Sequence, residues 1–203
     1  MIGGSNFYTQ EELESIGFKS IGTNVKISKL AQLYKHELIS IGNNVRIEDF
    51  CILNGEITLG DNVTICSFSL LDGYAGIELN EDVTLATRVS IHSGSDDYSG
   101  RSLFGTYVPS KYRLFHKRGK VVVRSHTLIG DSSIIMPCLT LGEGTAIGAN
   151  SFVKNSTEPW GIYCGIPAKR IKDRSKDLLP QWGLFKDGRL DDLYAMIRTS
   201  ENI

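Results

Sequence analysis

Residues 41–76 read IGNNVR, IEDFCI, LNGEIT, LGDNVT, ICSFSL and LDGYAG, six-residue units that each open with Ile or Leu. The same phase is present at 21–32, resumes at 79–96 after a two-residue slip, and returns at 123–158. A period of six does not give the stripe of an amphipathic helix, and it is typical of a parallel β-helix built from hexapeptide repeats. We therefore predict an all-β coil with the first, aliphatic residue inside and the fifth residue where faces meet.

Turn geometry and the persistence of the phase support this fold. Gly, Asn and Asp fill positions two to four, as in Gly42, Asn43 and Asn44, and these residues tolerate left-handed backbone turns. A β-sandwich with turns at similar spacing is the alternative, but it does not require the phase to hold through so many units. Each coil buries its interior only against the next, so stability accumulates by stacking.

Composition excludes several other classes. The 22 Lys and Arg residues balance 23 Asp and Glu residues, which gives no bulk electrostatic case for nucleic acid or a membrane surface. No apolar run approaches the roughly 20 residues of a membrane helix, and no signal pattern opens the chain, so we expect a cytoplasmic protein. The four cysteines lack CxxC spacing and are expected to be structural thiols.

Both ends carry helical patterns. Thr9 and Glu12 form a capping box that predicts a short helix closed by Gly17, which would seal the first coil. After Ile171, helical spacing continues into a tail that we expect Pro180 and Gly183 to break, with a second amphipathic helix at 189–198.

The repeat stops at residues 90–120, SIHSGSDDYSGRSLFGTYVPSKYRLFHKRGK, and the segment 96–119 is predicted to project from the coil as a loop. The repeats, this loop and the ending GIYCGIPAKRIKD at 161–173 resemble the left-handed β-helix acyltransferases that use acyl-CoA. The blocks NFYTQEELESIGF and ISIGNNVRIEDFCIL are similar to the branch that acylates nucleotide-linked 4-amino-4,6-dideoxyglucose, which includes the anthrose-pathway enzyme. The regions expected are a capping helix at 1–20, the β-helix at 21–157, and a CoA-binding turn with helical tail at 158–203.

The resemblance implies acetyl-CoA or another acyl-CoA as cosubstrate, no metal, and a homotrimer with sites at subunit interfaces. It places acyl-CoA in the groove between neighbouring coils, where small residues leave backbone groups open to the pantetheine arm, although coil corners demand small residues in any case. Cations that follow the GIPAKRI turn would neutralise the CoA phosphates. The candidate residues are Gly130, Ser132, Gly148, Ala149, Lys154, Lys169 and Lys172.

Acyl transfer to an amine requires removal of a proton as the bond forms. Many family members place a histidine base on the loop, whereas this chain has Asp96 and Asp97 in that register. A carboxylate is a weak base for a hydroxyl but can hold a sugar amine, so the pair favours N-acylation. Neighbours on a strand point opposite ways, so only one of the two is expected to face the acceptor. We favour Asp97 as the catalytic group, with Asp96 close behind. A solvated turn pair is the alternative interpretation.

Other loop residues are candidates for the acceptor site. His92 is a competing base or hydrogen-bond donor, or a plain surface histidine, and Thr87 is a candidate hydrogen-bond partner of the acceptor. His126 is expected to be a groove wall, with His36 and His116 peripheral. Cations and aromatics of the loop are candidates for the sugar-nucleotide diphosphate and base, or for a subunit interface: Tyr98, Arg101, Phe104, Tyr107, Lys111, Tyr112, Arg113 and Lys117.

The function predicted is acyl transfer, most simply of acetyl, to the 4-amino group of a dTDP-linked 4-amino-4,6-dideoxy sugar for O-antigen or other surface polysaccharide. Sugar O-acetylation is the near alternative, and it predicts a strong histidine base. A zinc hydratase of the γ-carbonic anhydrase type is a second alternative, and it requires three histidine ligands. A structural β-helix without catalysis is the third.

Overall fold

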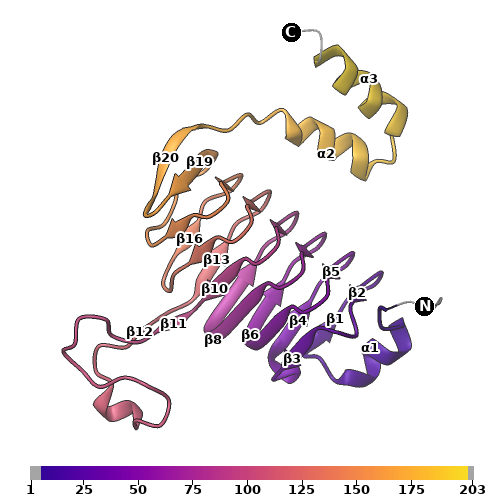
Figure 1. Cartoon of the computed structure of the whole chain (residues 1–203). Coiled ribbons are helices and arrows are strands. Elements are labelled where there is room, and N and C mark those ends of the chain that lie inside the picture. Colours follow the sequence, from indigo (N-terminus) through magenta and orange to yellow (C-terminus); the bar gives the residue numbers. More distant parts are fainter. Residues whose placement is uncertain (1–5, 201–203) are drawn as a thin grey trace.

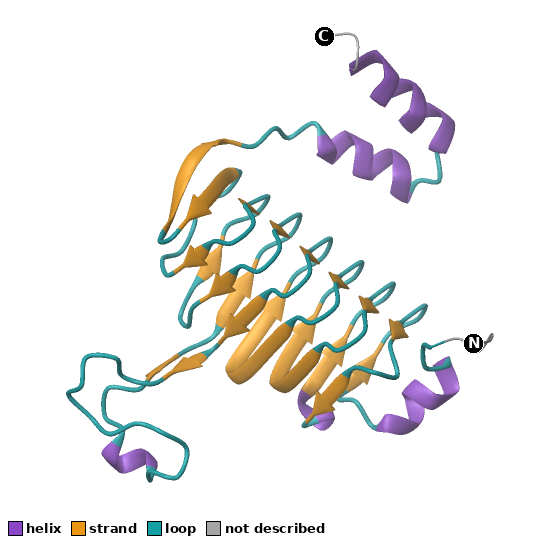
Figure 2. Ribbon diagram, in the orientation of Figure 1, coloured by secondary structure: helices purple, strands orange, loops and turns teal. Residues whose placement is uncertain are grey.

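The computed structural model describes residues 6–200, so the outermost parts of the expected regions at 1–20 and 158–203 lie outside it. Its body is a stack of coils with three parallel faces, and pairing strands lie eighteen to twenty residues apart along most of the stack (Figures 1 and 2). The first face holds β3 (Gln32–Tyr34), β6 (Ile52–Leu59), β8 (Leu70–Leu79), β10 (Ser90–His92), β15 (Ile134–Ile135) and β18 (Phe152–Val153).

The other two faces complete each coil. Strands β6 and β8 bend and continue into the second face, with β1 (Ser20–Ile21), β4 (Ile39–Ile41), β13 (Val121–Val123) and β16 (Thr140–Leu141). The third face holds β2 (Lys26–Ile27), β5 (Arg46–Ile47), β7 (Thr64–Ile65), β9 (Thr84–Leu85), β14 (Leu128–Ile129), β17 (Ala146–Ile147), β19 (Gly161–Gly165) and β20 (Ala168–Asp173).

The core follows the repeat as predicted. First and fifth residues of the units point inward, and Ile47, Leu53, Val63 and Ile65 have no exposed surface. Apolar burial of this kind contributes about 25 cal/mol per Å², and here it extends unbroken from coil to coil. The stack is therefore one continuous core and not two small domains.

Of positions two to four, where left-handed turn geometry was predicted, only the fourth adopts it in these units. The left-handed conformation falls on the fourth residue of a unit, with φ of 57° at Asn44 and 59° at Asn62. Glycine at position two has another cause, because a Cβ on Gly42 would lie 2.8 Å from the carbonyl carbon of Gly60 in the next coil. Close stacking of the coils, and not a positive φ, requires glycine there.

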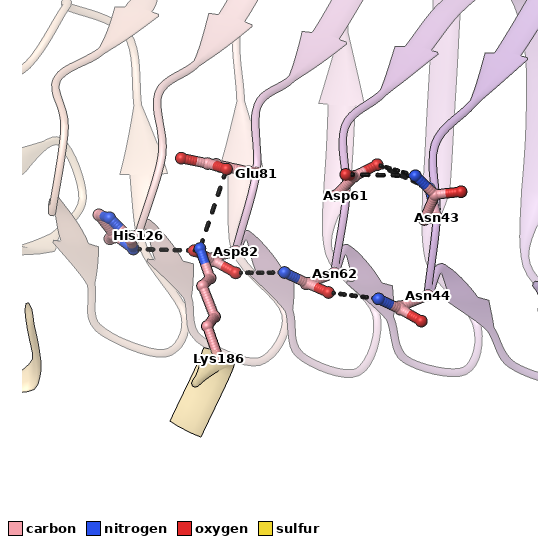
Figure 3. Close-up of polar contacts among 8 residues, drawn as sticks. All are labelled: Asn43, Asn44, Asp61, Asn62, Glu81, Asp82, His126 and Lys186. Carbon is pink, nitrogen blue, oxygen red and sulfur yellow. Dashed lines mark hydrogen bonds and ion pairs between the residues drawn. The ribbon is translucent and has the colours of Figure 1, made fainter. Parts of the chain in front are cut away.

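At the corner between the second and third faces, the fourth residues form an asparagine ladder (Figure 3). The Nδ2 of Asn24 donates to Asn44 Oδ1 at 2.9 Å, Asn44 donates to Asn62 at 3.0 Å, and Asn62 donates to Asp82 Oδ1 at 2.8 Å. The ladder satisfies side chains that carry both a donor and an acceptor, and it ends at a carboxylate that can only accept.

The N-terminal prediction is confirmed. Helix α1 (Gln10–Ile16) has a capping box in which Glu12 N–H donates to Thr9 Oγ1 and Thr9 N–H donates to Glu12 Oε2, and it ends at Gly17 with φ 87°. Leu13 is fully buried and joins the core, so the helix covers the first coil.

In the tail, the second helix predicted at 189–198 is confirmed, but the break predicted at Pro180 and Gly183 is wrong. Helix α2 (Leu178–Lys186) contains Pro180 and Gly183 without a break. Pro180 is the third helical residue, where the missing N–H has no intrahelical partner in any case. The chain turns instead at Gly188, with φ 71°, before α3 (Leu190–Ser200). Among the described residues, no helix is long and apolar enough to cross a membrane.

The predicted loop projects from the corner between the first and second faces (Figure 1). Its stem is the antiparallel pair β11 (Gly94–Ser95) and β12 (Lys117–Arg118), and its far end holds the short 3₁₀ helix η2 (Ser110–Tyr112). A second short 3₁₀ helix, η1 (His36–Leu38), precedes β4. The stem is anchored because Gly119 N–H donates to Ser93 O at 3.0 Å.

Candidate functional site

An open groove of about 540 Å³ lies where the loop stem leaves the first face. The register pairs Ser90 with Ile134 and Ile134 with Phe152, so the outward side chains of β15 and β18 form its apolar floor. The groove combines this floor with polar groups of the stem: His92, Gly94, Ser95, Asp96, Tyr98, Ile134, Met136 and Phe152. A concave apolar site with few convergent polar groups is the usual form of a small-molecule site.

Asp96 lies on the groove wall and has unused hydrogen-bonding capacity. Its Oδ2 accepts from Gly105 N–H at 3.1 Å, but the buried Oδ1 has no hydrogen-bond partner. The nearest cation is Arg113, whose Nη1 lies 3.7 Å from Oδ1 and whose side chain is mostly buried, with Nε also unpaired. Arg113 is thus turned toward Asp96 at the loop base, and its predicted contact with a diphosphate is not favoured by this position.

Asp97 is fully engaged in its own turn. Oδ1 accepts from the N–H and hydroxyl of Ser99, and Oδ2 accepts from the N–H groups of Arg101 and Ser102 at 2.9 and 3.1 Å. These bonds, led by the Ser99 hydroxyl, hold the pKa of Asp97 below its usual value. The side chain is therefore a carboxylate at neutral pH and a weak base.

His92 and His116 lie on either side of the stem. His92 is half-buried on the groove wall, in register with Asp72 of the preceding coil. His116 packs against the Tyr74 ring at 5.8 Å, and its buried Nδ1 is unpaired, so it is less peripheral than predicted. Thr87 lies on the turn before β10, where its N–H donates to Asp131 Oδ1 at 3.0 Å.

The loop residues predicted to bind the acceptor are spread out. Tyr98 is 93% exposed at the groove, whereas Arg101 stacks on the Phe115 ring at 4.3 Å. Lys111 lies 4.8 Å from the Tyr112 ring centre on η2. Each of these two cations therefore lies against an aromatic ring of its own loop.

The small residues predicted to line the CoA groove lie where the backbones of successive coils pack closely against one another. A Cβ on Gly130 would lie 2.7 Å from Ala149 N, and a Cβ on Gly148 would lie 3.0 Å from Cys164 Cβ. Ser132 takes the left-handed position with φ 58°. Coil stacking alone therefore explains the two glycines.

The cations assigned to CoA phosphates lie at the last coils. Lys169 and Lys172 are exposed on β20, in register with Cys164 and Ile162 of β19, and Lys154 is exposed just after β18. Arg170 between them is occupied by an ion pair with Asp173 at 2.8 Å. The free lysines remain available to an anion.

Comparison with known proteins fits this geometry. Residues 39–73 match the family model for the bacterial transferase hexapeptide (six repeats). A dTDP-4-amino-4,6-dideoxy-D-glucose acyltransferase of Escherichia coli is 42% identical over 184 residues, which is 89% of this chain and 95% of that protein. The chain belongs to the hexapeptide-repeat acyltransferase family. The left-handed β-helix and the family predicted from the sequence are thereby confirmed.

Solved structures agree with this family assignment. AntD, an N-acyltransferase from Bacillus cereus, has been crystallised with dTDP-4-amino-4,6-dideoxyglucose and coenzyme A, and it is 44% identical with a TM-score of 0.88 over 90% of this chain and 98% of AntD. Another AntD structure holds dTDP and 3-hydroxybutyryl-CoA, at 43% identity and a TM-score of 0.88, over 91% of this chain and 98% of AntD.

The structure also adds groove residues that the sequence did not single out. Ile134, Met136 and Phe152 form the floor of this hexapeptide-transferase groove. Ile134 and Phe152 are sixth residues of IGDSSI and IGANSF, a position where other units carry Arg46 or Thr64. A bulky apolar residue at an outward position was the signal that could have found them.

Proposed function

We propose that the protein transfers an acyl group from acyl-CoA to the 4-amino group of dTDP-4-amino-4,6-dideoxyglucose. The observation that carries the proposal is the identity of 42–44% to enzymes of this reaction along nearly the whole chain. The groove supports it, because its lining holds the Asp96 carboxylate and a single histidine, His92, whereas a hydratase requires three histidines. Among the described residues, the one group able to hold a metal contains a single histidine.

A carboxylate site suits an amine acceptor. The acceptor amine must be held near the thioester and must lose a proton as the amide forms. An ionised Asp97 accepts a hydrogen bond from the amine, takes up the proton that the nitrogen loses as the amide forms, and releases it to water or to the leaving thiolate, without acting as a strong base. Of its four hydrogen-bond donors, the Ser99 hydroxyl is the one not held by backbone, and the amine can replace it.

Spacing supports the pair Thr87 and Asp97. The AntD structures include variants in which one aspartate is changed to Asn or Ala, and a serine ten residues earlier is changed to Thr, Ala or Cys. Thr87 and Asp97 stand at that spacing in this chain. We assign Thr87 a hydrogen bond to the acceptor and Asp97 the amine, with Asp96 and His92 shaping the groove.

The proposed homotrimer is supported by apolar side chains that are exposed on and beside the first face. Phe50 and Phe68 stack at 5.0 Å on the corner beside it and are each about half exposed, and Ile52 and Ile134 point outward from its strands. This apolar stripe, Phe50, Ile52, Phe68, Leu70, Ile134 and Phe152, leads to the groove. A neighbouring copy seated on it would cover the stripe, and its loop would close the site.

In this arrangement acyl-CoA lies along the last coils, with the pantetheine arm beside Gly130, Gly148 and Ala149 and the phosphates near Lys169 and Lys172. Lys154 would lie toward the adenine. Tyr98, Arg101 and Lys111 of a neighbour's loop would contact the dTDP moiety. The acylated sugar would then serve O-antigen or related surface polysaccharide synthesis in the cytoplasm.

The test is thiol release from acetyl-CoA, and separately from 3-hydroxybutyryl-CoA, with dTDP-4-amino-4,6-dideoxyglucose as acceptor and dTDP-glucose as control. The variants Asp96→Asn and Asp97→Asn are run in parallel. We expect release with the amino sugar alone, with kcat reduced at least tenfold in Asp97→Asn. Equal release with both sugars would refute N-acylation, and a loss confined to Asp96→Asn would move the amine to Asp96.

A further inference from the structure

The asparagine ladder changes character at the two coils that flank the inserted loop. Asn24, Asn44 and Asn62 pass one hydrogen bond from coil to coil, but the next two fourth residues are Asp82 and His126. Both have the same left-handed backbone, with φ of 57° and 60°. Asparagine is well suited to that conformation, so the fold itself does not require a carboxylate and an imidazole here.

The two side chains enclose a position for a positive charge. The Asp82 side chain has no exposed surface, and a buried carboxylate requires a compensating cation. Lys186 at the end of α2 supplies it, with Nζ 2.9 Å from Asp82 Oδ2 and 3.9 Å from Glu81 Oε2 (Figure 3). Two carboxylates therefore already lie beside one cationic atom.

His126 is the residue that the ion pair leaves unexplained. Its Nδ1 is buried, makes no hydrogen bond, and lies 3.4 Å from Asp82 Oδ2. In a tetrahedral zinc site with bonds of about 2.0–2.1 Å, ligand atoms are about 3.3–3.4 Å apart. The two atoms thus already have the separation of two ligands of one metal ion. An oxygen of Glu81 lies within 4.8 Å of both, on a half-exposed side chain whose ion-pair contact in the structure is with Lys186.

We propose that Glu81, Asp82 and His126 bind one divalent transition-metal ion, best matched by Zn²⁺, in exchange for the Lys186 ammonium. Imidazole together with carboxylates is a donor set that suits zinc and its neighbours better than Mg²⁺ or Ca²⁺. Binding of the ion would displace the Lys186 ammonium from Asp82 and so break this contact between α2 and the coil. Acyl transfer does not use this ion, and the site shares no residue with the groove.

Lys186 is the internal competitor of the metal. Its Nζ lies 2.9 Å from Asp82 Oδ2, where the ammonium charge compensates the carboxylate that the metal would need. Removing that charge should therefore strengthen metal binding, whereas a structural ion pair alone would give the variant no affinity for metal. This opposite sign distinguishes the two roles of the cluster.

The experiment is equilibrium dialysis of the untagged full chain against ZnCl₂, with bound metal counted by mass spectrometry. The visible spectrum of the Co²⁺-loaded protein reports the ligands. Variants are His126→Asn and Asp82→Asn, which keep the residue type of the ladder, and Lys186→Met. We expect one Zn²⁺ per chain, affinity at least tenfold weaker in both Asn variants, and at least threefold tighter in Lys186→Met.

Any one of three results refutes the proposal. Lys186→Met could lack a saturable site for one ion per chain, or His126→Asn could bind zinc with the affinity of wild type. The third is a thiolate charge-transfer band with Co²⁺, which would place the ion at a cysteine. Unchanged thermal denaturation of the Asn variants without metal verifies that they fold. None of these readouts depends on the proposed acyltransferase activity.

Discussion

Replacing Asn62 separates the two tasks of a fourth residue, bridging coils and adopting a left-handed backbone. Its Nδ2 donates to Asp82 Oδ1 at 2.8 Å, its Oδ1 accepts from Asn44 at 3.0 Å, and its φ is 59°. One neutral hydrogen bond contributes about 1 kcal/mol, and one to a carboxylate about 1.5–3 kcal/mol. Because Asn62 is half-buried and water replaces part of both, we expect Asn62→Gly to cost about 2 kcal/mol.

The variant Asn62→Ala loses the same bonds and, unlike Asn62→Gly, keeps a Cβ at positive φ without the polar side chain that favours this conformation, which costs about 1–2 kcal/mol more. Its expected cost is therefore about 3–4 kcal/mol. Both are measured by urea denaturation at one protomer concentration, since assembly changes apparent stability. The control Asn155→Ala, at an exposed site, should stay within about 0.5 kcal/mol. If Asn62→Gly is as destabilised as Asn62→Ala, the assignment of strain to the fourth position is wrong.

Four further changes test separate parts of the molecule. Thr9→Ala removes the cap of α1 and should lower the free energy of unfolding by about 1 kcal/mol, measured by thermal denaturation. An unchanged stability would show that the cap does not stabilise the fold. Ile65→Ala opens a cavity in the fully buried core, with an expected loss of about 2–5 kcal/mol in urea; a loss under 1 kcal/mol would contradict close packing. Phe68→Asn suits the φ of 64° but removes the exposed ring. If the proposed trimer uses the apolar stripe, sedimentation should show smaller species for this variant than for wild type, with an unchanged circular dichroism spectrum; equal sedimentation of the two would exclude the stripe as the proposed interface. Burial raises the pKa of Cys51 to about 11, so it stays a protonated thiol up to about pH 10 and resists iodoacetamide at pH 8, whereas exposed Cys138 is alkylated first; the reverse order by mass spectrometry would place Cys51 at the surface.

The fold was predictable because every unit repeats one local solution. The units IGNNVR and LGDNVT each have an inward first residue, an inward fifth residue and a turn between them. A single pattern therefore predicts the three faces of the coil as well as its core. The exact turn residue was not predictable from residue types, because Phe50, Arg88 and Cys138 also occupy the left-handed position. Their presence shows that the stacking of the coils overrides local preference.

The predicted break in the helical tail was wrong because of where Pro180 lies within α2. Proline breaks a helix in its interior but not in its first turn, and Pro180 falls in the first turn of α2. The sequence pattern does not fix the start of α2 within that distance. Likewise Asp96 and Asp97 are equivalent as letters, and they differ only through hydrogen bonds to Gly105 and Ser99 set by the folded loop.

Register explains what sequence can still reveal about the cluster at Asp82. Asp82 and His126 are fourth residues of LNEDVT and VRSHTL, and the projecting loop leaves those two units in successive coils, since Leu128 pairs with Thr84. The contact was therefore implicit in the repeat once the loop was treated as an insertion. Lys186 carries no such register, because it arrives from a helix outside the coil. A repeat thus predicts its own ladders, whereas the charge that meets the end of the ladder depends on the path of the tail.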